Sequence, residues 1–150
     1  MSNFLGFGQF KGKSHEWVFF RAPWYARWLY NNGIYRQRHS FDEVEATHFP
    51  MLYRRASHLK GTCEQCNQPA TRMGLTFLAS GSLSSVGFFC NNCKYLGGAR
   101  TTYETPSFFP ENARLPRNAQ RMITDEIRRR YIHGRLTQKK MEGFFTECAF

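Results

Sequence analysis

Two cysteine pairs constrain the fold of this chain more than any other feature of its sequence. Cys63 and Cys66 form one Cys-x-x-Cys motif, Cys90 and Cys93 form a second, and 23 residues separate the two motifs. This spacing predicts that four thiolates surround one tetrahedral Zn²⁺, because each pair can supply two ligands from one tight turn. A site with four cysteine ligands is closed to water, so the pattern favours a structural zinc over a catalytic one.

The segment between the motifs is typical of a zinc ribbon. Residues 70–78 and 85–90 are expected to form two strands, joined by a Gly/Ser-rich turn at residues 80–84. The alternatives are a pair of disulfides or a dithiol redox centre. A redox centre would have one Cys-x-x-Cys pair in a β-α-β setting, which this sequence lacks. His58 is near enough to Cys63 to replace a ligand, but we expect it to be a surface or core residue.

Positive charge is concentrated on either side of the cysteine segment. The 150-residue chain has a net charge of +10, with +5 in residues 1–62, zero in residues 63–93 and +5 in residues 94–150. These three segments are the expected units of the chain. An aromatic content of 17% argues against a disordered basic tail. No apolar run is long enough to cross a membrane, and the first residues do not resemble a secretory signal. Together with the odd cysteine count, this predicts a reducing, cytoplasmic location.

The N-terminal module is expected to be a small hairpin followed by a helix. Glycines alternate with phenylalanines over residues 4–12, which suits a hairpin, and residues 15–20 are expected to continue as a strand. Pro23 fits the first turn of a helix and Gly33 fits the position just after its end. Pro50 is expected to break the chain further on.

Residues 7–33 resemble a known small bacterial module. The segments FGQFKGKSHEWV and APWYARWLYNNG are similar to its pattern FGKYKGKxxEEV followed by PxDYLxWLxxNG. The matching positions are Gly8, Phe10, Lys11, Gly12, Lys13, Glu16, Val18, Pro23, Tyr25, Trp28, Leu29 and Gly33. The module occurs as short free-standing proteins and as an appendage at the C-terminal end of DEDD-type, exonuclease X-like exonucleases. The resemblance implies an accessory role with nucleic acids and transfers no catalytic residue; Trp17, Trp24 and Tyr30 are bulkier than the pattern.

The C-terminal segment is expected to be a proline-rich stretch followed by two basic helices. Phe108 and Phe109 are expected to dock the stretch onto the rest of the protein. Asn118 is the expected cap of the first helix and Gly134 its expected stop. The second helix has the spacing of one buried face at Met141, Phe144, Phe145 and Cys148. The expected fold class is therefore α+β, with a hairpin-plus-helix module, a central ribbon and a C-terminal helical pair.

Cations of the two end segments are the candidate nucleic-acid contacts. Basic turns and helices with interleaved aromatics are typical of phosphate-binding surfaces. The candidates are Lys11, Lys13, Arg54, Arg55, Arg128, Arg129, Arg130, Arg135, Lys139 and Lys140. We therefore hypothesise a zinc-stabilised accessory protein that binds DNA or RNA or assembles nucleoprotein. Its setting would be a larger bacterial, phage or mobile-element machine, such as a CRISPR-type effector.

Two other functions stay open from the sequence. One is a protein-interaction module or phage inhibitor that docks on an acidic partner such as a nuclease, because arginine and aromatic residues also dominate protein interfaces. The other is a metal-dependent nuclease using Asp42, Glu43 and Glu45, although such enzymes bring several carboxylates to one point. No catalytic motif is recognisable, so we expect no enzymatic activity.

Overall fold

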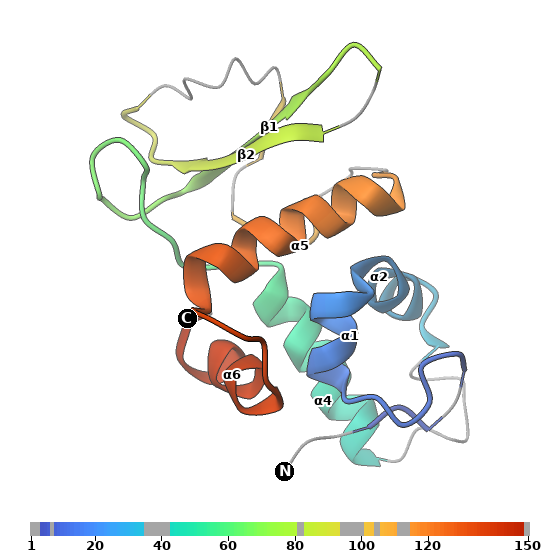
Figure 1. Ribbon diagram of the computed structural model, residues 1–150. Coiled ribbons are helices and arrows are strands. Elements are labelled where there is room, and N and C mark those ends of the chain that lie inside the picture. Colours follow the sequence, from blue (N-terminus) through green and yellow to red (C-terminus); the bar gives the residue numbers. More distant parts are fainter. Residues whose placement is uncertain are drawn as a thin grey trace.

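An α+β fold is confirmed by the computed structural model, in which a group of helices and a small sheet lie on either side of helix α5 (Figure 1). The helices are α1 (His15–Arg21), α2 (Pro23–Asn31), α4 (Glu43–Ala56), α5 (Arg117–Tyr131) and α6 (Gln138–Gly143), and α6 continues as the π-helical turn η1 (Phe144–Cys148). The strands are β1 (Arg72–Phe77), β2 (Leu83–Phe89) and β3 (Thr101–Tyr103). The structure describes residues 4–6, 8–34, 43–80, 83–93, 101–103, 106–110 and 115–148.

The N-terminal loop closes as a hairpin would, but a helix follows it. An isolated antiparallel bridge joins Phe4 to Ser14. Ser14 then caps α1, because its hydroxyl accepts a hydrogen bond from the Trp17 N–H at 3.1 Å. The prediction of a strand over residues 15–20 is therefore wrong. A strand alternates its faces, whereas α1 buries Val18, Phe19 and Phe20 side by side.

Helix α4 runs through Pro50, where the sequence predicts a break. A proline inside a helix costs about 3 kcal/mol because it removes a donor and crowds the preceding turn. Phe49, Leu52 and Tyr53 are buried around it. Burying side chains of this size contributes about 1.5–3 kcal/mol each. The prediction of a break is wrong because tertiary burial outweighs the local cost.

An aromatic core joins the helices to the proline-rich segment 106–110. Phe108 lies 5.3 Å from Phe20 and 5.7 Å from Phe144, measured between ring centroids. Phe109 stacks on Tyr53 at 4.6 Å. Both phenylalanines of the segment are buried, so the expected docking is confirmed. Met141, Phe144 and Phe145 are also buried as predicted, whereas the side chain of Cys148 lies outside the described residues.

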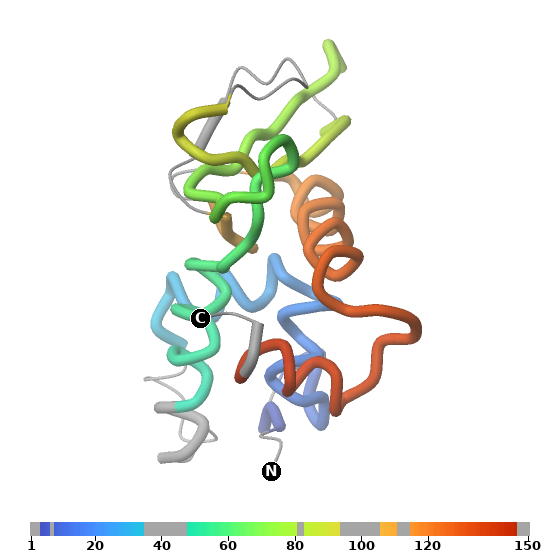
Figure 2. The backbone as a smooth tube through the Cα atoms, turned by 90° about the vertical axis from the view of Figure 1, so that its left-hand side faces the viewer, coloured from blue at the N-terminus to red at the C-terminus, as the bar shows by residue number. Residues whose placement is uncertain are grey.

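Strands β1 and β2 form the hairpin predicted between the cysteine motifs. They pair antiparallel from Arg72 opposite Phe89 to Phe77 opposite Leu83. Strand β3, which the sequence did not predict, pairs with the other side of β1 and makes the order β2-β1-β3. Seen from the side, α5 lies between this sheet and the helical group (Figure 2).

Helix α5 begins and ends at slightly different residues than the sequence predicts. Pro116 occupies the cap position, so the predicted cap at Asn118 is wrong, and the helix ends at Tyr131. Gly134 follows in the left-handed region with φ of 76°. None of the described helices has the length and apolar character needed to span a lipid bilayer.

Candidate metal centre and nucleic-acid interface

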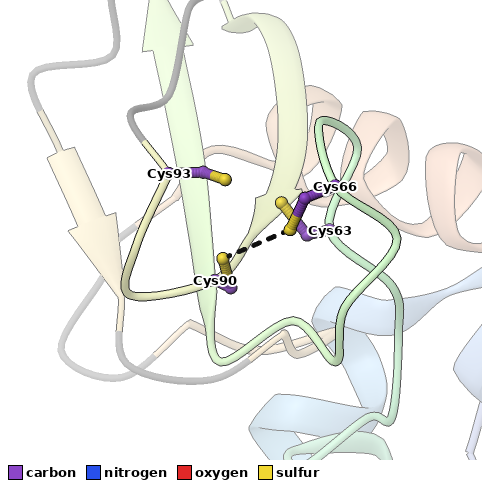
Figure 3. A group of neighbouring side chains, drawn as sticks. All are labelled: Cys63, Cys66, Cys90 and Cys93. Atoms are coloured by element: carbon purple, nitrogen blue, oxygen red, sulfur yellow. Dashed lines mark hydrogen bonds between the residues drawn. The ribbon is translucent and has the colours of Figure 1, made fainter.

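The four predicted cysteine ligands converge beside the sheet. Figure 3 shows the sulfurs of Cys63, Cys66, Cys90 and Cys93 turned toward one point. All four sulfurs lie within 4.8 Å of one another, and those of Cys66 and Cys90 are 3.6 Å apart. Zinc–sulfur bonds of about 2.3 Å in a tetrahedron place sulfurs about 3.8 Å apart. These four side chains are free thiols and are positioned to hold one metal ion.

A short turn presents the first cysteine pair. Cys63 N–H donates to the carbonyl of Gln68 at 2.7 Å, and Asn67 N–H donates to the carbonyl of Cys63 at 3.0 Å. Asn67 takes a left-handed conformation with φ of 59°, which asparagine tolerates better than most residues. Thr62 and Pro69 close the turn with an antiparallel bridge. In the second pair, Cys90 directly follows β2, and the Cys93 N–H donates to the carbonyl of Cys90 at 3.4 Å.

Backbone hydrogen bonds to the sulfurs lower the pKa values of some of the four thiols, and the closeness of the other thiols raises the pKa of Cys93. Burial raises the pKa of Cys63, but backbone N–H groups around it outweigh burial and lower the pKa to about 6. The backbone N–H of Asn92 lowers the pKa of Cys90. The neighbouring thiols of Cys90 and Cys66 raise the pKa of Cys93 to about 12. The cluster thus resists carrying four negative charges by itself, and a divalent cation would relieve this repulsion.

Helix α5 is attached to the first cysteine turn at its C-terminal end. Arg130 forms ion pairs with Glu64 in that turn and with Glu126 on its own helix. Its guanidinium also lies 4.6 Å from the centroid of the Phe88 ring on β2. The Tyr131 hydroxyl donates to the carbonyl of Lys60. The metal centre, β2 and the arginine-rich end of α5 are therefore one connected unit.

Gly61 is required where this unit closes. A Cβ atom at residue 61 would lie 2.8 Å from Cδ2 of Phe88 and 2.9 Å from the Tyr131 hydroxyl. Real Cβ atoms essentially never approach other atoms this closely. The absence of a side chain at Gly61 therefore permits contact between α5 and the chain that enters the cysteine turn.

Most of the predicted phosphate-contacting cations are exposed, but two are used inside the fold. The exposed ones are Lys11, Lys13, Arg54, Arg129, Arg135, Lys139 and Lys140, and Arg128 is half-buried. Arg55 donates to the carbonyl of Phe145 at 3.0 Å. Arg130 is held by its two glutamates, and Arg129 pairs with Glu126 while 75% of its side chain remains exposed. The structure thus separates cations that stabilise the fold from cations that face solvent.

Basic segments from the two ends of the chain meet between α1 and α6. The Ser14 hydroxyl donates to Oε1 of Gln138 at 2.6 Å, across 124 residues of sequence. This contact brings the loop that carries Lys11 and Lys13 to the first turn of α6, which carries Lys139 (Figure 1). We call the exposed residues Lys11, Lys13, Arg135, Lys139 and Lys140 the cationic surface.

Comparison with known proteins identifies no relative of this chain. No family model, curated protein or solved structure matches it. The resemblance of residues 7–33 to the exonuclease-associated module therefore stays a prediction.

A groove of about 810 Å³ lies between β2 and α5. Its apolar lining includes Val86, Met122 and Ile132. Asp125, Glu126, Arg128 and Arg129 line it as well, so charges of both signs are present. The sequence did not predict this groove, because helical and strand periodicity do not show which face of α5 meets the sheet.

The remaining sequence candidates do not extend the metal centre. His58 is exposed and is not part of the cysteine cluster. Asp42 lies outside the described residues, as do the side chains of Glu43 and Glu45 in α4. The nuclease hypothesis therefore stays a prediction.

A buried polar cluster joins α1, α4 and α6, and the sequence did not predict it. Oε1 of Glu16 lies 3.5 Å from Nε2 of His48, and Oε2 of Glu16 accepts a hydrogen bond from Gln138 at 3.3 Å. Nδ1 of His15 lies 3.0 Å from Nδ1 of His48. Burial raises the pKa of Glu16 above its usual 4.5. Burial, with a smaller contribution from Arg55, lowers the pKa of His48 below its usual 6.5.

This cluster predicts a pH-dependent loss of stability on the acid side of neutrality. Because the pKa of His48 is lower in the folded chain, the unfolded chain binds a proton at His48 more readily below pH 6.5. The contribution of His48 to the free energy of unfolding therefore decreases as pH falls. The limit for one proton is about 1.4 kcal/mol per pH unit. Glu16 acts in the opposite direction, because its folded state keeps a proton that the unfolded state loses above pH 4.5.

The measurement is urea unfolding at pH 7.5 and pH 5.5 in the Glu16→Gln background, which removes the opposing carboxyl. We expect stability to fall between these pH values, and His48→Gln added to that background to flatten the dependence. An equal pH dependence with and without His48 would contradict the assignment.

Proposed function

We propose that this protein is a zinc-stabilised nucleic-acid-binding accessory protein that works within a larger DNA- or RNA-handling complex. The observation that carries the proposal is the attachment of the four-cysteine centre to the arginine-rich end of α5 through Arg130 and Glu64. Zinc is the metal that four thiolates favour in a tetrahedral site. Its role would be to hold the sheet and the end of α5 in one arrangement.

The cationic surface supplies the contacts in this proposal. Lys11, Arg135 and Lys139 make no ion pair with any residue that the structure describes. Exposed cations without carboxylate partners can bind phosphates of a nucleic acid and displace the counterions condensed on its backbone. The cations come from both ends of the chain, so phosphate binding would use the folded protein rather than one basic segment.

The proposal predicts steeply salt-dependent binding to nucleic acid. With about six phosphate contacts, we expect affinity for a fluorescently labelled 20-nucleotide single strand to fall by about 300-fold between 50 and 200 mM salt. The double variant Arg135→Ala/Lys139→Ala should reduce the magnitude of the slope of log K against log salt by about 1.4, because each lost contact no longer releases counterions from the strand. Fluorescence anisotropy measures both quantities.

The matched control is Arg21→Ala, which removes an exposed cation of α1 that is not part of the cationic surface. It should leave both affinity and slope close to those of the unmodified protein. Absence of binding to DNA and RNA at 20 mM salt would refute the proposal, as would binding that salt does not weaken.

A second candidate function is a protein-interaction module, favoured by the groove between β2 and α5. The apolar side chains of Val86, Met122 and Ile132 in a charged rim suit a peptide with both apolar and charged residues. Met122 is 40% exposed, so Met122→Asp would place a charge in the groove without disturbing the core. A partner that survives nuclease treatment in a pull-down and is lost with Met122→Asp would support this candidate.

A further inference from the structure

We propose that Trp24 and Trp28 of α2, together with Arg117 and Arg121 of α5, form a binding site for unpaired bases of a single-stranded nucleic acid. This inference rests on the proposed function and names the form of nucleic acid that the protein prefers. None of these four residues belongs to the cationic surface or to the phosphate-contacting cations predicted from the sequence.

Two arginines share one indole ring at this site. The guanidinium carbons of Arg117 and Arg121 lie 5.4 Å and 5.5 Å from the centroid of the Trp24 ring. The two arginines are one helical turn apart and are both exposed. Contacts between α2 and α5 bring Trp24 to them from more than 90 residues earlier in the chain. The indole fixes both guanidinium groups on one side of α5 through cation–π interactions.

The guanidinium groups of Arg117 and Arg121 place two positive charges close together. Like charges four residues apart on a helix repel one another. Neither Arg117 nor Arg121 forms an ion pair with any carboxylate in the described part of the chain. One neutral indole cannot neutralise two cations, whereas the planar N–H fork of arginine matches the oxygens of a phosphate group. The arrangement therefore favours an anion with phosphate geometry.

An exposed aromatic face lies beside this anion site. Trp28 follows Trp24 by one turn of α2 and is 45% exposed, whereas Trp17 and Trp24 are half-buried. Tyr25 supports one side of it, with ring centroids 5.5 Å apart. Stacking on an exposed indole requires a base that is not already paired and stacked in a duplex. Phosphate-binding arginines next to such a face therefore favour single strands over duplexes.

Helix α5 connects this site to its own basic end. At 100° per residue, Arg117, Arg121 and Arg128 lie within about 40° of one another around the helix. Arg117 and Arg128 are about 16 Å apart along the axis, which is the length of about five nucleotides at 3.4 Å per nucleotide. Asp125 is exposed next to this row of arginines and opposes it. A single nucleic-acid strand lying along α5 would contact Arg117 and Arg121 at one end of the helix and Arg128 near the other end.

The test compares a 12-nucleotide oligo(dT) with a 12-base-pair duplex at 50 mM salt. We expect oligo(dT) to bind at least about tenfold more tightly than the duplex and to quench tryptophan fluorescence. Trp28→Leu should weaken oligo(dT) binding by about 5–150-fold, remove most of the quenching and leave duplex binding unchanged. The double variant Arg117→Gln/Arg121→Gln keeps Trp28 and should also weaken oligo(dT) binding. Asp125→Asn removes a negative charge beside the arginines and should strengthen oligo(dT) binding.

Controls separate this inference from the proposed function. Arg21→Gln removes an exposed cation that belongs neither to the cationic surface nor to the site at Trp24. This variant should still bind oligo(dT) more tightly than the duplex. Equal affinity for oligo(dT) and the duplex would overturn the inference, as would undiminished oligo(dT) binding by Trp28→Leu. The proposed function would still stand in either case if binding weakened with salt. No binding to either nucleic acid would overturn both.

Two further probes test the identity of the ligand. Inorganic tripolyphosphate that quenches tryptophan as strongly as oligo(dT) would show a phosphate site without base stacking, and would overturn the inference. A polyglutamate peptide that binds in a Trp28-dependent way, while oligo(dT) does not, would assign the site to an acidic protein and overturn it as well.

Discussion

Removing the metal is expected to unfold the sheet and lower the free energy of unfolding by several kcal/mol. Around the thiols, Cys63, Phe89 and Cys90 form only a minor cluster, whereas Met73, Leu75 and Phe88 of the sheet belong to the core that it shares with the helices. Sheets of this size are marginally stable without further support. Free zinc at about 1,000 times its Kd would contribute about 4.1 kcal/mol by mass action. We expect one equivalent of zinc in the purified protein and a large decrease in Tm when a chelator removes it.

Cys63→Ser should reproduce the effect of the chelator, because Cys63 is fully buried at the centre of the cluster. Hydrogen exchange should then show loss of protection in β1 and β2. The matched control is Cys148→Ser, which changes the cysteine that belongs to neither Cys-x-x-Cys motif and should keep one equivalent of zinc. Unchanged melting of Cys63→Ser, or a folded protein with no bound metal, would contradict a structural role for zinc.

Phe108→Ala is expected to lower the free energy of unfolding by about 3–5 kcal/mol. Phe108 is fully buried and contacts Phe20, Phe144 and Phe145 on two different helical elements. Its backbone N–H also donates to the carbonyl of Ala56 at 2.9 Å. Truncation would leave a cavity where the proline-rich segment joins the helices. Urea denaturation of the zinc-loaded protein measures the loss.

The comparison variant is Phe77→Ala at the end of β1, where the same truncation removes a side chain that is 37% exposed. A partly exposed phenylalanine leaves no closed cavity, so we expect a loss of about 1 kcal/mol or less. If Phe108→Ala cost no more than Phe77→Ala, the segment would not be part of the core.

Local patterns predicted the four clustered cysteines and the hairpin between them. The spacing of each cysteine pair, the strand residues and the Gly/Ser turn all act within 31 consecutive residues, 63–93. Strand β3 was missed because its three residues, although threonine and tyrosine favour strands, are too few to show an alternating pattern. Short segments of this kind have no periodicity that can be read from the sequence.

The errors in the N-terminal half have a common physical cause. Aromatic residues at 15–20 have high strand propensity, yet the Ser14 cap and the burial of successive side chains stabilise α1. Pro50 is unfavourable inside a helix, yet its buried neighbours keep α4 continuous. In both places, burial against distant parts of the chain outweighs a local preference of a few kcal/mol.

Spacing and composition alone predict the four clustered cysteines, the hairpin between them and the two basic ends of the chain. Which cations stabilise the fold and which face solvent depends instead on tertiary contacts. Arg130 and Glu64 are 66 residues apart, and Trp24 meets Arg117 across a still longer separation. Such contacts depend on how α5 sits between the sheet and the helices, and no local pattern encodes that position.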